Sequence, residues 1–231
     1  MHTTDVYRAT RERIIALLRS APHGAAERPV PGCPEWTVRQ VASHLTGVVD
    51  DALAGNLADA GQDHWTAAQV AARDDRSLDE ILAEWTERAP VLEAALGPDG
   101  APAQLVFDTT THEHDLRAAL GVPGVDADSV AVSMGFVVEV LPGAVAGLPE
   151  LWIEPTDGGP AFTIGSGGQP GRLRGARFDL LRSFSGRRSA DQIAALDWDG
   201  DPATWISAFT FGPFRVPAEP VEPGPSPLVS D

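Results

Sequence analysis

The 231-residue sequence contains no lysine, and all 17 of its basic residues are arginine. Set against 33 acidic residues, they leave a formal net charge of -16. A strongly acidic chain without a basic patch binds phosphate backbones poorly, so we expect no nucleic-acid partner. The absence of lysine beside abundant alanine, glycine, aspartate and arginine also indicates a GC-rich genome.

Cysteine and long apolar runs are scarce as well. Cys33 is the single cysteine, which excludes an intramolecular disulfide and a zinc site with several cysteine ligands. No apolar run approaches the roughly 20 residues that a membrane-spanning helix needs, so we expect no membrane association. The N-terminal stretch 1–5 lacks the basic region and apolar core of a signal peptide, which predicts a cytoplasmic protein.

The hydrophobic pattern is that of an α+β protein with a helical part followed by a mixed part. Apolar spacing predicts helices at 4–19, 38–53, 65–72, 78–96, 102–120 and 126–141, with a linker at 21–36 and Pro142 as the final stop. Capping-box patterns open three helices, at 37–40, 77–80 and 189–192. Short strands are predicted at 151–154, 161–164 and 172–174, and helices at 178–184 and 202–209.

These elements suggest three segments. We expect residues 1–147 to form a helical bundle, residues 148–216 a small mixed α+β domain, and residues 217–231 a disordered tail rich in proline, glutamate and serine.

The stretch from Phe107 to Arg117 is the most informative part of the sequence for function. Helical spacing places Asp108 and His112 on one face between leucines, and Asp115 beside them. His44 lies in the apolar stripe of an earlier helix. Helical bundles build metal sites from ligands four residues apart on one helix and a third on a neighbour, and two imidazoles with a carboxylate suit Zn²⁺. Asp115 could accept a hydrogen bond from the other ring nitrogen of His112.

The same residues have plainer interpretations. His44 could be an ordinary core histidine, and Asp108 and His112 could form only an intrahelical hydrogen bond. Cys33 lies just before a helix N-terminus, where a thiolate is favoured. No histidine base lies near it in the sequence, so we interpret it as a structural residue.

Two segments resemble a known family. VPGCPEWTVRQVASHL at Val30–Leu45 resembles the Pro-x-Trp-(Ser/Thr)-Val…His-Leu signature of the mycothiol-dependent maleylpyruvate isomerase-like proteins of actinobacteria, which are related to DinB-type metalloproteins. DTTTHEHDLRAALG at Asp108–Gly121 is similar to the second metal-binding segment of that family. The resemblance implies an N-terminal up-and-down four-helix (DinB-like) bundle. ARFDLLRSFSGRRS at Ala176–Ser189 resembles the small sterol-carrier-like α/β domain that follows it.

Carried over position by position, the metal ligands of the family fall on His44, Asp108 and His112. Asp108 is a departure, because the family usually has glutamate at this position and aspartate is one methylene shorter. The resemblance implies a divalent metal, with Zn²⁺ as the leading candidate, and mycothiol as thiol cosubstrate.

The implied activity is that of an S-transferase or isomerase in which a metal-bound thiolate attacks a small electrophilic substrate. Arg187, Arg188 and Arg215 are candidates to hold a substrate carboxylate, although paired surface arginines are often only solvated or salt-bridged. We expect a monomer or homodimer. The alternative is a non-catalytic metal- or ligand-binding or sensing protein on the same fold.

Overall fold

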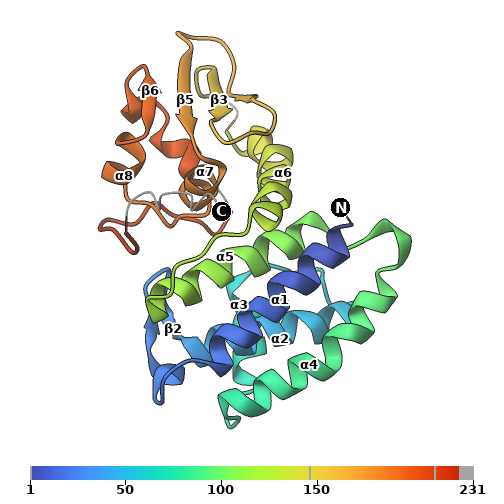
Figure 1. The fold of residues 1–231 in the computed structure, drawn as a ribbon. Helices are drawn as coiled ribbons and strands as arrows, with labels where there is room; N and C mark the ends of the chain where they lie inside the picture. Colours follow the sequence, from blue (N-terminus) through green and yellow to red (C-terminus); the bar gives the residue numbers. More distant parts are fainter. Residues whose placement is uncertain (1, 146, 211, 224–231) are drawn as a thin grey trace. The chain divides into compact units, whose positions relative to one another are not determined.

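The computed structural model describes residues 2–145, 147–210 and 212–223. The chain forms two compact units, Met1–Pro123 and Gly124–Asp231. The first unit is mainly helical and the second combines helices with a small sheet, so the predicted α+β class is confirmed (Figure 1).

The first unit contains the following elements in chain order: α1 (Thr3–Arg19), β1 (Pro29–Val30), β2 (Cys33–Thr37), α2 (Val38–Ala54), α3 (Asp63–Ala71), α4 (Leu78–Ala95) and α5 (Ala103–Leu120). Helix α1 packs against α5 and α4, and α2 packs against α4 and α5, which closes a four-helix bundle. Its core is apolar and fully enclosed, with Ile14, Trp85 and Leu116 all at 0% exposure. Each such side chain contributes roughly 1.5–3 kcal/mol by leaving water.

Local sequence sets where the bundle helices begin. The Thr37 hydroxyl accepts a hydrogen bond from the backbone N–H of Gln40, and the Gln40 side chain accepts one from the backbone N–H of Thr37. Ser77 and Glu80 form the same reciprocal pair at the start of α4. These capping boxes confirm the predicted helix starts. As a result His44 falls on the second turn of α2.

The predicted linker at 21–36 is partly wrong. Strands β1 and β2 pair in a short antiparallel sheet, with Val30 opposite Cys33 and Pro29 opposite Thr37. Strand β1 packs on α5 and β2 packs on α2. A two-residue strand that includes proline is too short to show an alternating pattern, so it could not be predicted from the sequence.

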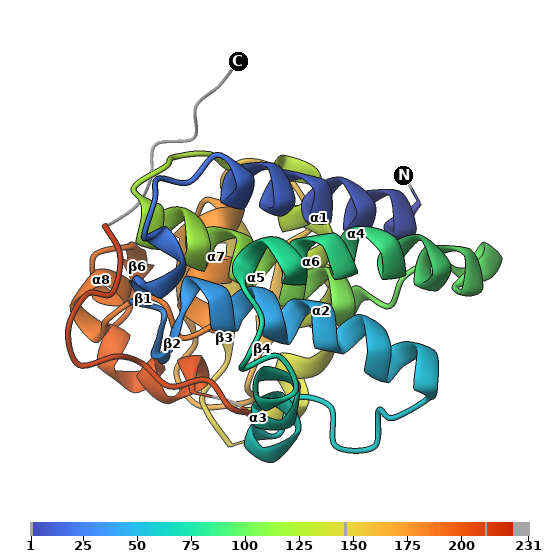
Figure 2. The same cartoon turned by 90° about the horizontal axis from the view of Figure 1, so that it is seen from below.

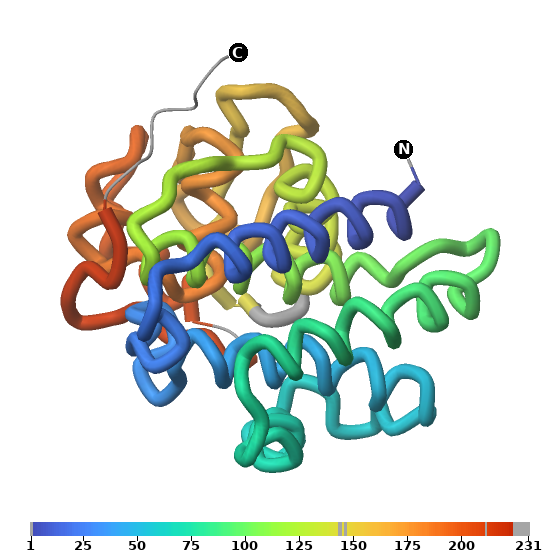
Figure 3. The backbone as a smooth tube through the Cα atoms, turned by 60° about the horizontal axis from the view of Figure 1, so that its bottom comes forward, coloured from blue at the N-terminus to red at the C-terminus, as the bar shows by residue number. Residues whose placement is uncertain are grey.

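Helix α3 lies beside α2 and outside the four bundle helices (Figures 2 and 3). Gly47 of α2 permits this close approach. A Cβ atom built on Gly47 would lie 2.5 Å from Cβ and 2.6 Å from Cγ of Gln69 on α3.

The second unit contains α6 (Ala127–Ala144), β3 (Leu151–Pro155), β4 (Phe162–Ile164), β5 (Gly171–Gly175), α7 (Arg177–Phe184), α8 (Ala190–Ala194) and β6 (Asp197–Asp199). The sheet order is β4-β3-β5-β6, in which β3 and β5 are parallel and the other pairs antiparallel. Helix α6 packs on α7 and β4. The units therefore divide ahead of α6, whereas the sequence placed a boundary after it, at residue 147.

Two predictions in this unit need correction, and one strand is additional to the predicted ones. Helix α6 continues through Pro142 to Ala144, because a proline in the last turn removes only one backbone hydrogen bond. The predicted helix at 202–209 is a pair of 3₁₀ turns, at 202–204 and 206–209. Strand β6, which pairs with β5, was not predicted.

The start of the tail that was predicted to be disordered, from residue 217, makes specific contacts in the structure. The Glu222 carboxylate pairs with the guanidinium groups of Arg182 and Arg188, both of which are buried. This contact holds the start of the tail in place, because each buried cation needs an anionic partner. Residues 224–231 of the predicted tail lie outside the described residues.

Candidate metal centre

The three predicted ligands lie together in the first unit. His44 projects from α2, and Asp108 and His112 project from successive turns of α5. The Asp108 carboxylate lies between the two imidazoles, with one oxygen 3.5 Å from Nε2 of His44 and the other 3.7 Å from Nε2 of His112. One ligand atom from each residue lies within 4.8 Å of the other two.

This donor set fits a divalent cation. Ligand atoms bound at about 2.1 Å in a tetrahedral zinc site lie about 3.4 Å apart. The two nitrogen–oxygen distances at Asp108 are close to that spacing. Two neutral imidazoles and one carboxylate are also a ligand combination that Zn²⁺ accepts.

The orientation of His44 is set by a residue that the sequence did not single out. Its Nδ1 lies 2.7 Å from Oε1 of Gln69, and Nε2 of Gln69 donates to Oδ2 of Asp51 at 2.6 Å. Because an ionised carboxylate only accepts hydrogen bonds, the amide nitrogen of Gln69 faces Asp51 and its oxygen faces His44. In the neutral ring the hydrogen of His44 is therefore on Nδ1, and Nε2, which faces Asp108, is the atom that a metal or a second proton would occupy.

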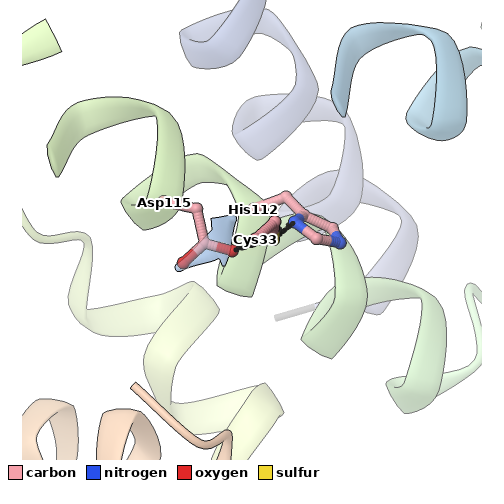
Figure 4. A group of neighbouring side chains, drawn as sticks. All are labelled: Cys33, His112 and Asp115. Atoms are coloured by element: carbon pink, nitrogen blue, oxygen red, sulfur yellow. Dashed lines mark hydrogen bonds and ion pairs between the residues drawn. The ribbon is translucent and has the colours of Figure 1, made fainter. Parts of the chain in front are cut away.

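His112 is oriented in the same sense by Asp115. Nδ1 of His112 lies 3.1 Å from Oδ2 of Asp115, whose carboxylate is fully buried. A carboxylate cannot donate, so His112 also carries its hydrogen on Nδ1 and presents an Nε2 lone pair. Figure 4 shows His112 and Asp115 on successive turns of α5, with Cys33 between them.

Cys33 is closer to a histidine than the sequence suggested. Its Sγ lies 3.8 Å from Nδ1 of His112 and donates to Oδ2 of Asp115 at 3.4 Å. His112 is 79 positions away from Cys33 in the sequence, so the residues near Cys33 could not indicate this contact. Because Nδ1 of His112 already carries a hydrogen bonded to Asp115, it cannot serve as a base for the thiol.

An aromatic ring covers the two imidazoles on one side. The Trp36 ring centroid is 5.1 Å from that of His44 and 6.1 Å from that of His112. Both histidines are buried, whereas 32% of the Asp108 side chain is exposed. Solvent therefore reaches this cluster at Asp108.

The charges around His44 favour a cation. Burial lowers the pKa of His44 and is the largest single effect. The charge of Asp108, the hydrogen bonds with Asp108 and Gln69 and the charge of Asp51 together outweigh it, and the pKa of His44 is raised above its ordinary value. The same carboxylate that would bind a metal thus also favours a proton on its neighbour.

A separate cavity of about 330 Å³ lies beside α3. Its lining includes Gly47, Asp51, Trp65 and Gln69, but none of the three predicted ligands. It therefore borders the residues that orient His44 rather than the ligand atoms.

The arginine candidates belong to the second unit, and Arg188 is already neutralised there. Its guanidinium pairs with Asp179 at 3.1 Å and with Glu222. Binding a substrate carboxylate at Arg188 would require one of these acidic partners to be displaced.

Arg187 and Arg215 have different surroundings. The Arg187 guanidinium lies 5.8 Å from the centroid of the Phe214 ring. Arg215 donates to the backbone oxygens of Gly212 and Phe214. The role of all three arginines in substrate binding stays a prediction.

Fold and site together define a two-unit α+β protein whose helical bundle brings two histidines and an aspartate to one point. Residues 7–121 match the mycothiol maleylpyruvate isomerase N-terminal domain. The chain belongs to this mycothiol-dependent maleylpyruvate isomerase-like family.

Two solved structures share the fold. The crystal structure of the mycothiol-dependent maleylpyruvate isomerase aligns with a TM-score of 0.59 and 15% identity, over 80% of this chain and 88% of that one. A histidine-to-alanine mutant of that isomerase aligns over the same shares with a TM-score of 0.58 and 13% identity. No curated protein matches the sequence. Among the described residues, no helix is both long and apolar enough to cross a membrane.

Proposed function

We propose that this protein is a metal-dependent, mycothiol-dependent S-transferase or isomerase that acts on a small electrophilic substrate. One observation carries the proposal: the Nε2 atoms of His44 and His112 lie on either side of the Asp108 carboxylate, and one ligand atom from each of the three residues lies within 4.8 Å of the other two. Three electron-pair donors at this spacing are the arrangement that a divalent cation requires. Membership of the family supports mycothiol as the thiol.

Each residue then has a distinct task. His44, Asp108 and His112 would hold Zn²⁺, which as a Lewis acid favours the thiolate form of a bound thiol. Gln69 and Asp115 would hold the hydrogen of each neutral ring on Nδ1, which leaves both Nε2 atoms available to the metal. The exposed side of Asp108 is where the thiol and the electrophile reach the site.

The thiolate of mycothiol forms a carbon–sulfur bond at an electrophilic carbon. In a transfer reaction a leaving group departs with the bonding electron pair, and the thioether is the product. In an isomerisation the thiolate adds to a conjugated double bond, the resulting single bond rotates, and elimination restores both the double bond and the thiolate. One of Arg187, Arg188 and Arg215 is proposed to hold a substrate carboxylate, since the guanidinium fork matches it.

Metal analysis of the purified protein tests the centre. We expect the wild-type protein to retain about one zinc ion per chain, and His44→Ala and His112→Ala to lose most of it. His64→Ala is the matched control, because His64 is 71% exposed and pairs only with Asp59 among the interactions seen. Unchanged zinc content in both ligand variants would refute the proposed site.

Turnover is tested separately. Mycothiol is mixed with a chlorinated arene or another electrophile, and thiol consumption is followed with the zinc-loaded and the chelated protein. Consumption that depends on the metal supports the transferase or isomerase. A zinc-loaded protein that consumes no thiol with any of several electrophiles would instead support the non-catalytic metal- or ligand-binding or sensing alternative.

A further inference from the structure

We propose that Gln69, Asp51 and Gly47 form a positioning device that selects the ring tautomer of His44. The device rests on the proposed metal centre, since its purpose is to present Nε2 of His44 as a ligand atom. Its three members come from two helices, α2 and α3. None of them is a ligand in the proposed site.

Hydrogen bonds connect Asp51 to His44 through the side chain of Gln69. Asp51 receives the amide hydrogen of Gln69 at 2.6 Å, and the Gln69 oxygen lies 2.7 Å from Nδ1 of His44. The other oxygen of Asp51 accepts from Nδ2 of Asn56 at 2.8 Å. Gln69 and His44 are both buried, so water does not compete freely for these atoms.

This series of hydrogen bonds fixes the orientation of the Gln69 amide, which has an oxygen that accepts and an NH₂ group that donates. If the Gln69 amide turned around, its NH₂ group would face Nδ1 of His44, and that nitrogen would have to accept. The hydrogen of the neutral ring would then be on Nε2, where it would block the metal. Asp51 prevents this reversal, because the turned amide would place its oxygen against a carboxylate that can only accept.

Gly47 provides the space for this arrangement. Any side chain at Gly47 would meet Cβ and Cγ of Gln69, which are the base of that side chain and cannot swing away without a movement of α3. A residue without a side chain on α2 thus keeps the amide of Gln69 within reach of both Asp51 and His44.

The tautomers of His44 and His112 are fixed in different ways. Asp115 accepts from His112 whichever way its carboxylate is turned, so His112 needs no third residue to fix its tautomer. His44 is held by a neutral amide and depends on Asp51. Removing the charge of Asp51 should therefore disturb His44 and leave His112 unchanged.

Four variants test the device. Gln69→Leu removes the acceptor, and Asp51→Asn lets the amide of Gln69 reverse. The double variant Asp51→Asn/Gln69→Glu rebuilds the chain with the amide and carboxylate exchanged. Asp50→Asn is the matched control, because it removes the same charge one residue away, where Asp50 pairs with Arg73 and Arg88.

Two readouts are used on the full-length chain. Zinc affinity is measured by competition with a chelator. The ring tautomer is measured from imidazole nitrogen-15 shifts of the metal-free protein at a pH above the pKa of His44, where the ring is neutral. We expect Gln69→Leu to bind zinc roughly 10- to 100-fold more weakly, the range found for partners that orient metal ligands. Asp51→Asn should show a second tautomer at His44 alone, and the double variant should restore one tautomer and near wild-type affinity.

The outcomes separate this inference from the proposed function. A wild-type protein that binds no zinc would refute the metal centre, while the tautomer measurement would still decide the role of Asp51. Unchanged tautomer and unchanged zinc affinity in both Gln69→Leu and Asp51→Asn would overturn the positioning device. An equal loss of affinity in Asp50→Asn would also overturn it, because the effect would then be one of net charge alone.

Discussion

Gly47→Ala is the sharpest single perturbation of the bundle. The added methyl group would lie 2.5 Å from Cβ of Gln69, whereas carbon atoms in contact lie about 3.5–4.0 Å apart. An overlap of this size requires α3 to shift away from α2, and overpacking of this kind costs about 1–3 kcal/mol. Replacing glycine by alanine inside a helix returns up to about 1 kcal/mol. The net loss of stability should therefore be small.

The effect on metal binding should be larger than the effect on stability. A shift of α3 carries the Gln69 amide away from His44, so Gly47→Ala should weaken zinc binding about as much as Gln69→Leu. A 10- to 100-fold loss corresponds to about 1.4–2.7 kcal/mol. Since both changes break the same contact, their effects on affinity should not add in the double variant.

The chain offers a matched control in Gly135 of α6. A Cβ atom built there meets nothing within 4 Å. Gly135→Ala should therefore raise the melting temperature of its unit and leave zinc affinity unchanged. The reasoning is refuted if Gly47→Ala keeps wild-type zinc affinity, or if its effect adds fully to that of Gln69→Leu.

Three further outcomes are expected. Burial raises the pKa of Tyr7, the single tyrosine of the chain, to about 12, against the opposing effects of Trp85 and Arg11. Its stabilising contribution of about 2.7 kcal/mol is present below pH 10 and lost as the pH rises to about 12. Phenolate absorbance should show this late titration, and Tyr7→Phe should resist alkaline unfolding better; titration near pH 10 in the folded protein would contradict it. Asp115→Ala should weaken zinc binding roughly 10- to 100-fold, as measured by chelator competition, because Asp115 orients His112. Cys33→Ser should leave zinc affinity unchanged. An equal loss in both variants would contradict this prediction and indicate that Cys33 takes part in metal binding. Chelation should lower the melting temperature, since zinc at about 100 times its Kd stabilises by about 2.7 kcal/mol; an unchanged value would contradict metal binding to the folded state.

Features of the fold that depend on residues close together in the chain could be predicted from the sequence. The capping boxes at Thr37 and Ser77 fixed the starts of α2 and α4, because the paired groups are three residues apart. Helical spacing likewise placed Asp108 and His112 on one face of α5. The structure brings His44 to the same point, as expected for neighbouring helices of a bundle.

Residues whose role depends on tertiary packing could not be predicted from the sequence. Gln69 is 25 positions from His44, and a glutamine in a short helix carries no pattern that indicates its partner. Gly47 is unfavourable for a helix interior when judged by propensity, and only the approach of α3 explains it. Cys33 reaches Asp115 because β1 and β2 form a sheet that is too short to predict.

The negative charges beside His44 and His112 favour the binding of a cation. Asp108 and Asp115 together bring two negative charges to His112, and Asp115 is fully buried. Buried carboxylates are costly unless a positive charge compensates them. A divalent cation would cancel both charges, with the imidazoles adding ligands but no charge. Burial lowers the pKa of His44, but the charge of Asp108, with Gln69 and Asp51, raises it above its ordinary value, so in the metal-free protein a proton on His44 offsets part of the charge of Asp108. Protons and metal should therefore compete for Nε2 of His44, so zinc affinity should fall steeply as the solution is acidified through that pKa.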